Sequence, residues 1–205
     1  MILKKLETGP IAVNTYIIGD EATKKAMVVD PGGDVPKILM ALAQDKLTCE
    51  MIFNTHTHWD HVGGNGELKK STGAPIVTHA DEAPFLSHLG EAASMFGMHA
   101  PDSPPADRLV KEGDVLKIGE LEFKVIELPG HSPCTVGLLI PGYAIVGDTL
   151  FAGSIGRTDF PGGDYAALIK NIREKLFTLP DATIVLSGHM SQTTIGREKS
   201  YNPFF

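Results

Sequence analysis

The stretch Thr55-His56-Thr57-His58-Trp59-Asp60-His61 is the most informative segment of this chain. It follows the apolar run Met51-Ile52-Phe53 and precedes Gly63-Gly64, so it lies where an expected strand ends and the backbone can turn sharply. Imidazole and carboxylate groups are the ligands that Zn²⁺ and similar ions prefer. Two histidines spaced by two, followed by Asp and His, present four such groups from one turn. The spacing therefore predicts a metal site on this loop.

Three further groups occupy matching places, because His131, Asp148 and His189 each come shortly after an expected strand. The carboxyl ends of strands are where α/β proteins commonly gather their sites. Each group alone is a weak signal, since a histidine or aspartate at a strand end is more often a turn or cap residue. Together they are too many for one tetrahedral ion but suit two adjacent ions that share a carboxylate. The candidate metal ligands are His56, His58, Asp60, His61, His131, Asp148 and His189.

The remaining histidines and the cysteines have simpler interpretations. His79 is expected in a turn, and His88 and His99 are expected at the surface or beside the site. Cys134 is close to His131, but we expect it to be a small buried side chain rather than a ligand. Two cysteines cannot form a disulfide framework, which predicts a reducing compartment and a cytoplasmic protein.

The order of expected elements favours two sheets covered by helices. A buried strand over 26–29 leads through a Pro-Gly-Gly turn to a helix that Asp34 should cap and that should run to about residue 46. A second helical stretch is expected over 81–98. From residue 115 onward the apolar period drops to two, and Pro141-Gly142 joins two strands as a hairpin. Hairpins mixed with crossovers fit two layers of sheet better than one parallel sheet.

Composition limits the class of protein. With 205 residues, 42% hydrophobic and 21% charged, the chain is expected to fold as a single globular domain over 1–205. The net charge is −7 and no basic run stands out, which disfavours a nucleic-acid partner. The longest uncharged stretch, 129–147, is rich in Pro and Gly and excludes a membrane span there, and the N-terminus shows no secretory signal.

These motifs resemble the metallo-β-lactamase superfamily, whose signature is His-x-His-x-Asp-His followed by a later His, Asp and His. The resemblance implies an α/β fold, a four-layer αββα sandwich of two mixed β-sheets flanked by helices. It also implies which residues hold each metal. One ion would be held by His56, His58 and His131, the other by Asp60, His61 and His189, with Asp148 bridging the two.

Within that superfamily, the stretch 147–163 is similar to short glyoxalase-II-like hydrolases of the hydroxyacylglutathione hydrolase type. This implies hydrolysis of a small thioester such as S-lactoylglutathione by a metal-bridging hydroxide, with Asp60 orienting the nucleophile. Arg157 would bind an anionic part of the substrate, although an ion pair with Asp159 is an equal alternative. Longer relatives add a helical domain that contacts glutathione, so we expect weak dependence on the thiol carrier.

Two other hypotheses stay open. The sulfur (persulfide) dioxygenases share the Arg-Thr-Asp-Phe stretch and would use His56, His131 and Asp148 to hold one iron. A closed structural metal site is disfavoured because the ligand set contains no cysteine. The expected cofactor is two divalent ions per chain, zinc first, with iron or manganese as alternatives. The expected partner is a small-molecule thioester, with the chain a monomer or small homo-oligomer.

Overall fold

The computed structural model describes all 205 residues. They form two compact units, of which the first comprises residues 1–110 and 116–122 and the second comprises 111–115 and 123–205. The expectation of one domain over 1–205 stays a prediction.

The first unit contains a six-stranded mixed sheet with the order β1-β2-β3-β4-β5-β6. The first three strands pair antiparallel, and β3 to β6 pair parallel. The central strands are buried along their length, as strands covered on both faces should be. The strands are β1 (Ile2–Thr8), β2 (Val13–Gly19), β3 (Lys25–Val29), β4 (Thr48–Phe53), β5 (Ile76–His79) and β6 (Arg108–Val110).

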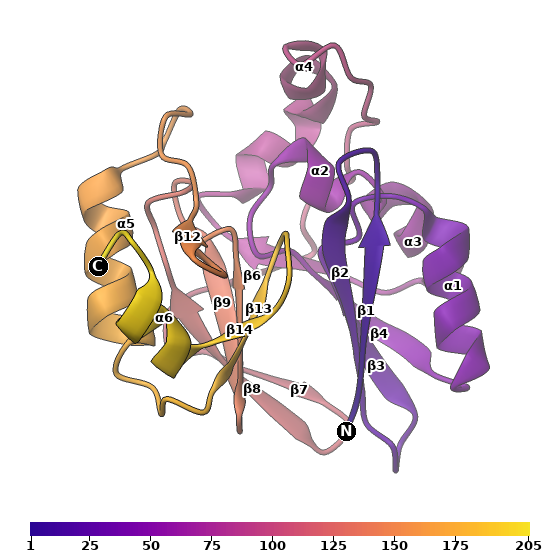
Figure 1. Cartoon of the computed structure of the whole chain (residues 1–205). Helices are drawn as coiled ribbons and strands as arrows, with labels where there is room; N and C mark the ends of the chain where they lie inside the picture. The colour runs from indigo at the N-terminus through magenta and orange to yellow at the C-terminus, as the bar shows by residue number, and fades with distance from the viewer. The chain divides into compact units, whose positions relative to one another are not determined.

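Helices cover this sheet, with α1 and α3 beside its strands (Figure 1). Ile38 of α1 and Leu68 of α3 pack in one apolar cluster with Ile17 and Ile52 of the sheet. Burying such a side chain contributes roughly 1.5–3 kcal/mol. The helices are α1 (Val35–Gln44), α2 (Trp59–Val62), α3 (Asn65–Thr72), the 3₁₀ helix η1 (Ala83–His88) and α4 (Leu89–Ser94).

Two local expectations in this unit are wrong. Asp34 precedes α1, but its side chain makes no capping hydrogen bond to the helix. Its backbone has a left-handed conformation (φ 47°), and its Oδ2 accepts a hydrogen bond from Gly9 N instead. The helix expected over 81–98 is divided into η1 and α4 and ends at Ser94. At the division, Ser87 Oγ donates to the Pro84 carbonyl, a local side-chain bond that competes with regular helix, and Gly97 (φ 68°) reverses the backbone beyond the end.

Most strands of the other six-stranded sheet belong to the second unit. This sheet has the order β14-β13-β10-β9-β8-β7; its β10–β13 pair is parallel and its other described pairs are antiparallel. A separate hairpin, β11-β12, follows β10. The strands are β7 (Val115–Ile118), β8 (Leu121–Glu127), β9 (Val136–Ile140), β10 (Tyr143–Gly147), β11 (Leu150–Phe151), β12 (Ser154–Ile155), β13 (Ile184–Ser187) and β14 (Thr193–Thr194).

Its helices are α5 (Tyr165–Asn171), the one-turn π-helix η2 (Ile172–Leu176) and α6 (Ile195–Tyr201). The side chain of Asp164 caps α5 by accepting from Ala167 N at 2.9 Å, as a residue of this type at that place should. Leu168 and Ile172 pack with Val185 in the apolar cluster of this unit, where α5 flanks the sheet (Figure 1). No helix in either unit has the length and apolar character needed to cross a bilayer. The expected fold class, two mixed sheets flanked by helices, is confirmed.

Candidate metal centre

The histidine-rich loop of the first unit connects β4 to α3 and is held at both ends. Asn54 and Asn65 exchange two amide hydrogen bonds, of 3.2 and 2.9 Å, and both are fully buried. Gly32 lies against the middle of the loop, where an added Cβ would come within 2.0 Å of the Asp60 carbonyl oxygen. Only glycine allows this approach, so the Pro-Gly-Gly turn and the ligand loop are packed backbone to backbone.

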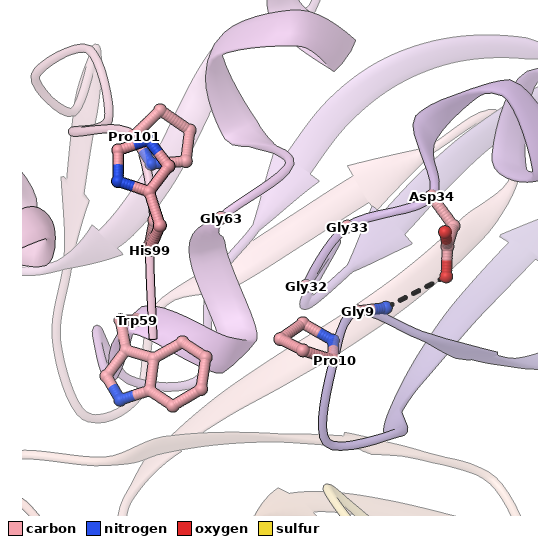
Figure 2. Close-up of a pocket in the computed structure, with 10 residues that line it drawn as sticks. Gly9, Pro10, Gly32, Gly33, Asp34, Trp59, Gly63, His99 and Pro101 are labelled. Atoms are coloured by element: carbon pink, nitrogen blue, oxygen red, sulfur yellow. Dashed lines mark hydrogen bonds between the residues drawn. The ribbon is translucent and has the colours of Figure 1, made fainter. Parts of the chain in front are cut away.

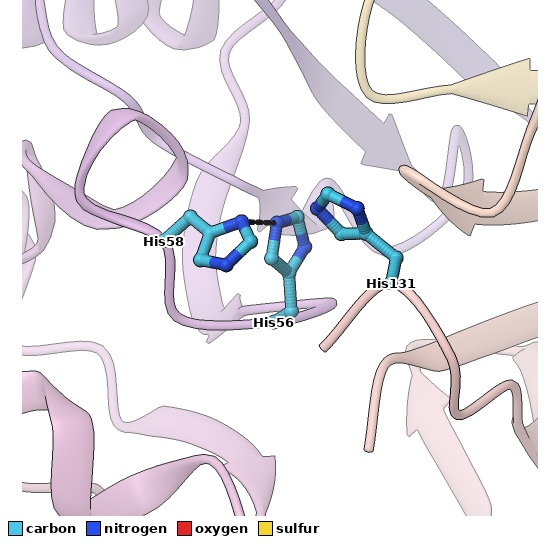
Figure 3. Close-up of side chains that lie close together, drawn as sticks. All are labelled: His56, His58 and His131. Carbon is cyan, nitrogen blue, oxygen red and sulfur yellow. Dashed lines mark hydrogen bonds between the residues drawn. The ribbon is translucent and has the colours of Figure 1, made fainter. Parts of the chain in front are cut away.

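The four candidate ligands of this loop lie close together. His56 Nε2 is 3.1 Å from His58 Nδ1, and the rings of His56 and His61 are 4.0 Å apart. His61 Nε2 lies 3.5 Å from Asp60 Oδ2. All but the half-buried His58 are buried. Figure 3 shows the His56–His58 contact as a dashed line.

Asp30, the residue directly after β3, orients this set. Its carboxylate accepts from Thr55 N (2.8 Å) and Thr55 Oγ1 (2.7 Å), and it lies 3.0 Å from His61 Nδ1. A carboxylate can only accept, so the His61 proton sits on Nδ1 and the Nε2 lone pair is available to a metal. Asp30 was not among the candidate residues, and the signal available for it was an acidic residue directly after a buried strand.

Glu82 positions the backbone between the first two histidines. Its Oε2 accepts from Thr57 N at 2.9 Å and from Thr57 Oγ1 at 2.8 Å, and the side chain is 1% exposed. This residue was missed among the candidates, because nothing in its local pattern distinguishes it from a surface glutamate of a helical stretch.

The second unit brings His131, Asp148 and His189 together. Asp148 Oδ2 is 3.7 Å from the Nε2 of His131 and 3.7 Å from the Nε2 of His189. Their loops follow β8, β10 and β13, three strands of one sheet. A single carboxylate oxygen thus lies equally near two imidazole nitrogens.

His131 is oriented through its other nitrogen. Its Nδ1 lies 2.8 Å from the carbonyl oxygen of Arg157, which can only accept, so Nδ1 carries the proton and Nε2 is left for a ligand. The contact between His131 and the Arg157 carbonyl requires glycine at position 156. A Cβ there would lie 1.8 Å from the Asp148 carbonyl oxygen and 3.2 Å from His131 Nδ1.

The Arg157 side chain is engaged with its neighbours. Its Nε donates to Asp159 Oδ1 and its Nη2 donates to Asp159 Oδ2, each at 2.7 Å. Its guanidinium carbon lies 3.6 Å from the Phe160 ring centroid. The hydrogen bond from Arg157 lowers the pKa of Asp159 to about 2, and the same pair raises the pKa of Arg157. The ion pair weighed as the alternative role of Arg157 is therefore present.

Of the other histidines, His88 and His99 are exposed, as expected. His79 was expected in a turn, but it is the last residue of β5, and its Nδ1 accepts from Asp81 N at 3.1 Å in the turn that follows. Cys49 and Cys134 are buried and form no disulfide. Burial raises the pKa of the Cys49 thiol to about 11, so it is not a nucleophile at neutral pH.

The donor set fits divalent metal ions. Histidines that bind metals usually donate their second ring N–H to a carboxylate or carbonyl oxygen, as His61 and His131 do here. Nitrogen and carboxylate donors without thiolate suit zinc, iron and manganese alike. The side chains can hold metal ions, and their chemistry does not select one metal.

Comparison with known proteins shows the family to which this chain belongs. A family model described as the metallo-beta-lactamase superfamily matches residues 8–189. Hydroxyacylglutathione hydrolase GloC of Haemophilus influenzae is 40% identical over 195 residues, covering 93% of this chain and 92% of that protein. The probable metallo-hydrolase YqgX of Bacillus subtilis is 36% identical, covering 98% and 96% of the two chains.

Three solved structures share the fold. BLEG-1, described as a B3 metallo-beta-lactamase, matches with a TM-score of 0.92 and 37% identity, covering 99% of each chain. TTHA1623 in a di-iron-bound form matches at 0.91 and 34%, covering 98% of this chain and all of that one. ETHE1 from Myxococcus xanthus matches at 0.85 and 33%, covering 99% and 84%.

Two mixed sheets flanked by helices, with candidate histidine and aspartate ligands on the loops that follow their strands, are typical of the metallo-β-lactamase fold. The chain belongs to the metallo-β-lactamase superfamily.

Proposed function

We propose that this protein hydrolyses a thioester of the S-lactoylglutathione type at a centre of two divalent metal ions. The observation that carries the proposal is the carboxylate of Asp148, with Oδ2 3.7 Å from the Nε2 of both His131 and His189. A carboxylate between two imidazoles suits a bridging ligand of a two-ion site, which is hydrolytic machinery. Similarity to hydroxyacylglutathione hydrolase GloC supports the reaction, and similarity to a di-iron-bound structure supports the ion count.

The proposed ligand sets follow the groups of side chains that could hold an ion. His56, His58 and His131 would hold one ion, Asp60, His61 and His189 the other, and Asp148 would bridge them. Bound divalent ions supply a water acidic enough to form hydroxide at neutral pH and a Lewis acid for the thioester carbonyl. Zinc is the first expectation, with iron or manganese as alternatives.

The chain's own residues prepare this chemistry. Asp30 and the Arg157 carbonyl hold protons on the Nδ1 atoms of His61 and His131, so neither ring can turn its protonated nitrogen toward the metal. In this proposal Asp60 would accept a hydrogen bond from the nucleophilic water and so orient it. A thiolate leaves readily, so no side chain is needed as a strong general acid.

Arg157 is the residue that we expect to contact an anionic part of the substrate. Because its guanidinium is paired with Asp159, an anionic substrate group would have to compete for it or share it. We therefore expect turnover to depend weakly on the thiol carrier. A small-molecule partner, the absence of nucleic-acid and membrane partners, a monomeric or small oligomeric state and a cytoplasmic location stay predictions.

The test compares wild type with His189→Ala, each loaded with zinc or iron. S-lactoylglutathione, a simple thioester, a β-lactam and glutathione persulfide are offered in turn, with oxygen uptake recorded for the last. We expect thioester cleavage by wild type, and loss of one ion with a rate lower by orders of magnitude in the variant. His88→Ala, a change at an exposed histidine, is the matched control and should behave as wild type.

Other results would replace the proposal. Persulfide-dependent oxygen uptake without thioester cleavage, with one iron retained in His189→Ala, would favour the mononuclear dioxygenase. Turnover of the β-lactam alone would assign a β-lactamase activity, the class to which the name of the similar BLEG-1 structure refers.

A further inference from the structure

A buried network of hydrogen bonds in the first unit connects two of the candidate ligands, His56 and His61. Its centre is the carboxylate of Asp30, which is 2% exposed, and its other member is the fully buried Thr55. Asp30 Oδ2 lies 2.7 Å from Thr55 Oγ1 and 3.0 Å from His61 Nδ1. Thr55 Oγ1 in turn lies 3.1 Å from His56 Nδ1. One carboxylate therefore contacts one histidine directly and the other through a hydroxyl group.

The direction of these hydrogen bonds follows from the number of protons available. An ionised carboxylate carries none, and two oxygens 2.7 Å apart need one between them, so the single hydroxyl proton of Thr55 is donated to Asp30 Oδ2. The Thr55 oxygen can then only accept, and His56 Nδ1 supplies the proton of the 3.1 Å contact. The Nε2 atom of His56 is left with a lone pair, as that of His61 is.

The lone pair of His56 Nε2 faces a second candidate ligand. His56 Nε2 lies 3.1 Å from His58 Nδ1 (Figure 3). Because His56 Nε2 carries no proton, His58 Nδ1 supplies the one in this contact. Nitrogens that bind a metal must be free of protons, and of these two only His58 Nδ1 has to release one. The Thr55 hydroxyl thus holds His56 in the tautomer that metal binding requires.

The backbone that carries the central carboxylate is fixed by its neighbours. Asp30 is left-handed (φ 49°), a conformation that aspartate and asparagine adopt more readily than most residues. Its N–H donates to the Phe53 carbonyl at 2.9 Å, and its carbonyl accepts from Thr15 Oγ1 at 2.7 Å. The turn that follows ends at Asp34, whose Oδ2 accepts from Gly9 N at 3.0 Å (Figure 2). The position of the carboxylate is therefore set by contacts on both sides of it.

We propose that Asp30 and Thr55 form one positioning unit that prepares a ligand for each of the two ions, His61 directly and His56 through the Thr55 hydroxyl. The inference rests on the two-ion centre of the proposed function, in which His56 and His61 belong to different ions, and does not depend on the substrate. The Thr55 hydroxyl serves the His56 branch alone, whereas the Asp30 carboxylate serves both branches. Substitutions at the two positions should therefore have different effects.

The first experiment titrates metal-free protein with zinc against a chelating indicator and measures the affinity of each binding step. Thr55→Val keeps the side-chain volume but removes the hydroxyl, so one of the two affinities should fall by about 10–100-fold. Asp30→Asn suits the left-handed backbone but places an amide donor where the carboxylate accepts, so both affinities should fall by about tenfold or more. Thr55→Ser keeps the hydroxyl and should restore both affinities to nearly the wild-type values.

Thr78→Val is the matched control, because it makes the same chemical change at another fully buried threonine. The Thr78 hydroxyl donates to the Asn54 carbonyl at 3.2 Å, next to the same loop, and not to a candidate ligand. Both zinc affinities should therefore stay at the wild-type values in this variant. Urea denaturation of each metal-free variant checks that it is folded.

The second experiment needs neither metal nor substrate. Nitrogen-15 NMR of the histidine rings distinguishes a ring nitrogen that carries a proton from one that does not. At about pH 8, where an ordinary imidazole is neutral, His56 of the metal-free wild type should carry its proton on Nδ1. This preference should be lost in Thr55→Val and restored in Thr55→Ser, while His61 should keep its proton on Nδ1 in both.

The outcomes separate this inference from the proposed function. Unchanged zinc affinities and an unchanged His56 tautomer in Thr55→Val would overturn the positioning unit, and thioester cleavage by the wild type would leave the proposed function standing. Losses of affinity in Thr78→Val equal to those in Thr55→Val would also overturn the unit. A wild type that binds two zinc ions but cleaves no thioester, with one affinity lost in Thr55→Val, would keep the unit and overturn the hydrolase.

Discussion

Asp148 is the residue on which the two-ion interpretation depends most directly. Its Oδ2 lies equally near the Nε2 atoms of His131 and His189, and the loop that carries it is held by close backbone packing at Gly156. A bridging carboxylate offsets the repulsion between two dications, so its removal leaves both ions short of a ligand.

Asp148→Ala is expected to lower bound metal by at least one ion per chain and to abolish hydrolysis. Elemental analysis of protein purified without added metal measures this. Asp181→Asn, at an exposed aspartate paired with Lys199, serves as the control. Full metal content in Asp148→Ala would contradict the bridging role.

The Arg157–Asp159 pair gives a prediction about pH. The pKa of Asp159 is lowered to about 2 by the hydrogen bond from Arg157. Because the folded-state pKa lies below the unfolded value of about 3.9, the contribution of the pair to stability is present above that value and is lost as pH falls through 2. We expect an NMR titration of the Asp159 carboxyl to have a midpoint near 2 in wild type. In Arg157→Ala the midpoint should move up toward 3.9. An unchanged midpoint would show that Arg157 is not the cause.

Among the secondary-structure elements, α6 is notable because its Glu198 forms hydrogen bonds with two separate segments. One segment follows the candidate ligand Asp148 and the other follows the candidate ligand His189. The Glu198 carboxylate, 1% exposed, accepts from Thr193 Oγ1 at the start of β14 and from Gly153 N in the β11-β12 turn at 2.8 Å. It also accepts from Asn202 Nδ2 at 2.8 Å. Asp148 precedes the hairpin and His189 precedes β14. One buried side chain therefore joins the end of the chain to both loops.

Glu198→Ala should destabilise the fold by about 3 kcal/mol, because it leaves buried donors without their acceptor. Urea denaturation measures the change. Glu198→Gln, which keeps the amide oxygen as an acceptor, should cost less, and Glu174→Ala at an exposed site should cost little. Equal stability of Glu198→Ala and wild type would show that water replaces these bonds.

At the scale of the whole molecule, the candidate ligands are far apart in sequence, the first being His56 and the last His189. An unfolded chain cannot hold them in one arrangement, so metal binding stabilises the folded state by mass action.

Removal of the metal with a chelator should lower Tm. Metal at a thousand times its Kd contributes about 4 kcal/mol. For a chain of this size that corresponds to a fall of roughly 8–16 °C. Calorimetry before and after chelation measures it, and Tm should recover when metal is restored. A Tm that does not respond to chelation would contradict a metal site built from the folded chain.

Local patterns in the sequence predict much of this fold. Apolar runs indicate strands at β3, β4, β9 and β10, because a buried strand needs little more than consecutive apolar residues. Asp164 indicates the start of α5 through its capping bond. The short elements β11, β12 and β14 were not expected, since two-residue strands carry no periodicity and exist only where tertiary hydrogen bonds hold them.

The candidate ligands can be recognised from the amino-acid order alone, because a metal site needs histidine and carboxylate side chains and these follow the ends of apolar runs. The groups that orient the ligands depend on the folded chain. Asp30 reaches His61 across 31 positions, and Glu82 reaches Thr57 across 25. The Arg157 carbonyl contacts His131 across 26 positions, so the backbone of Arg157, and not its side chain, orients that histidine. These contacts depend on which loops the sheets bring together, and no local pattern of residues specifies that.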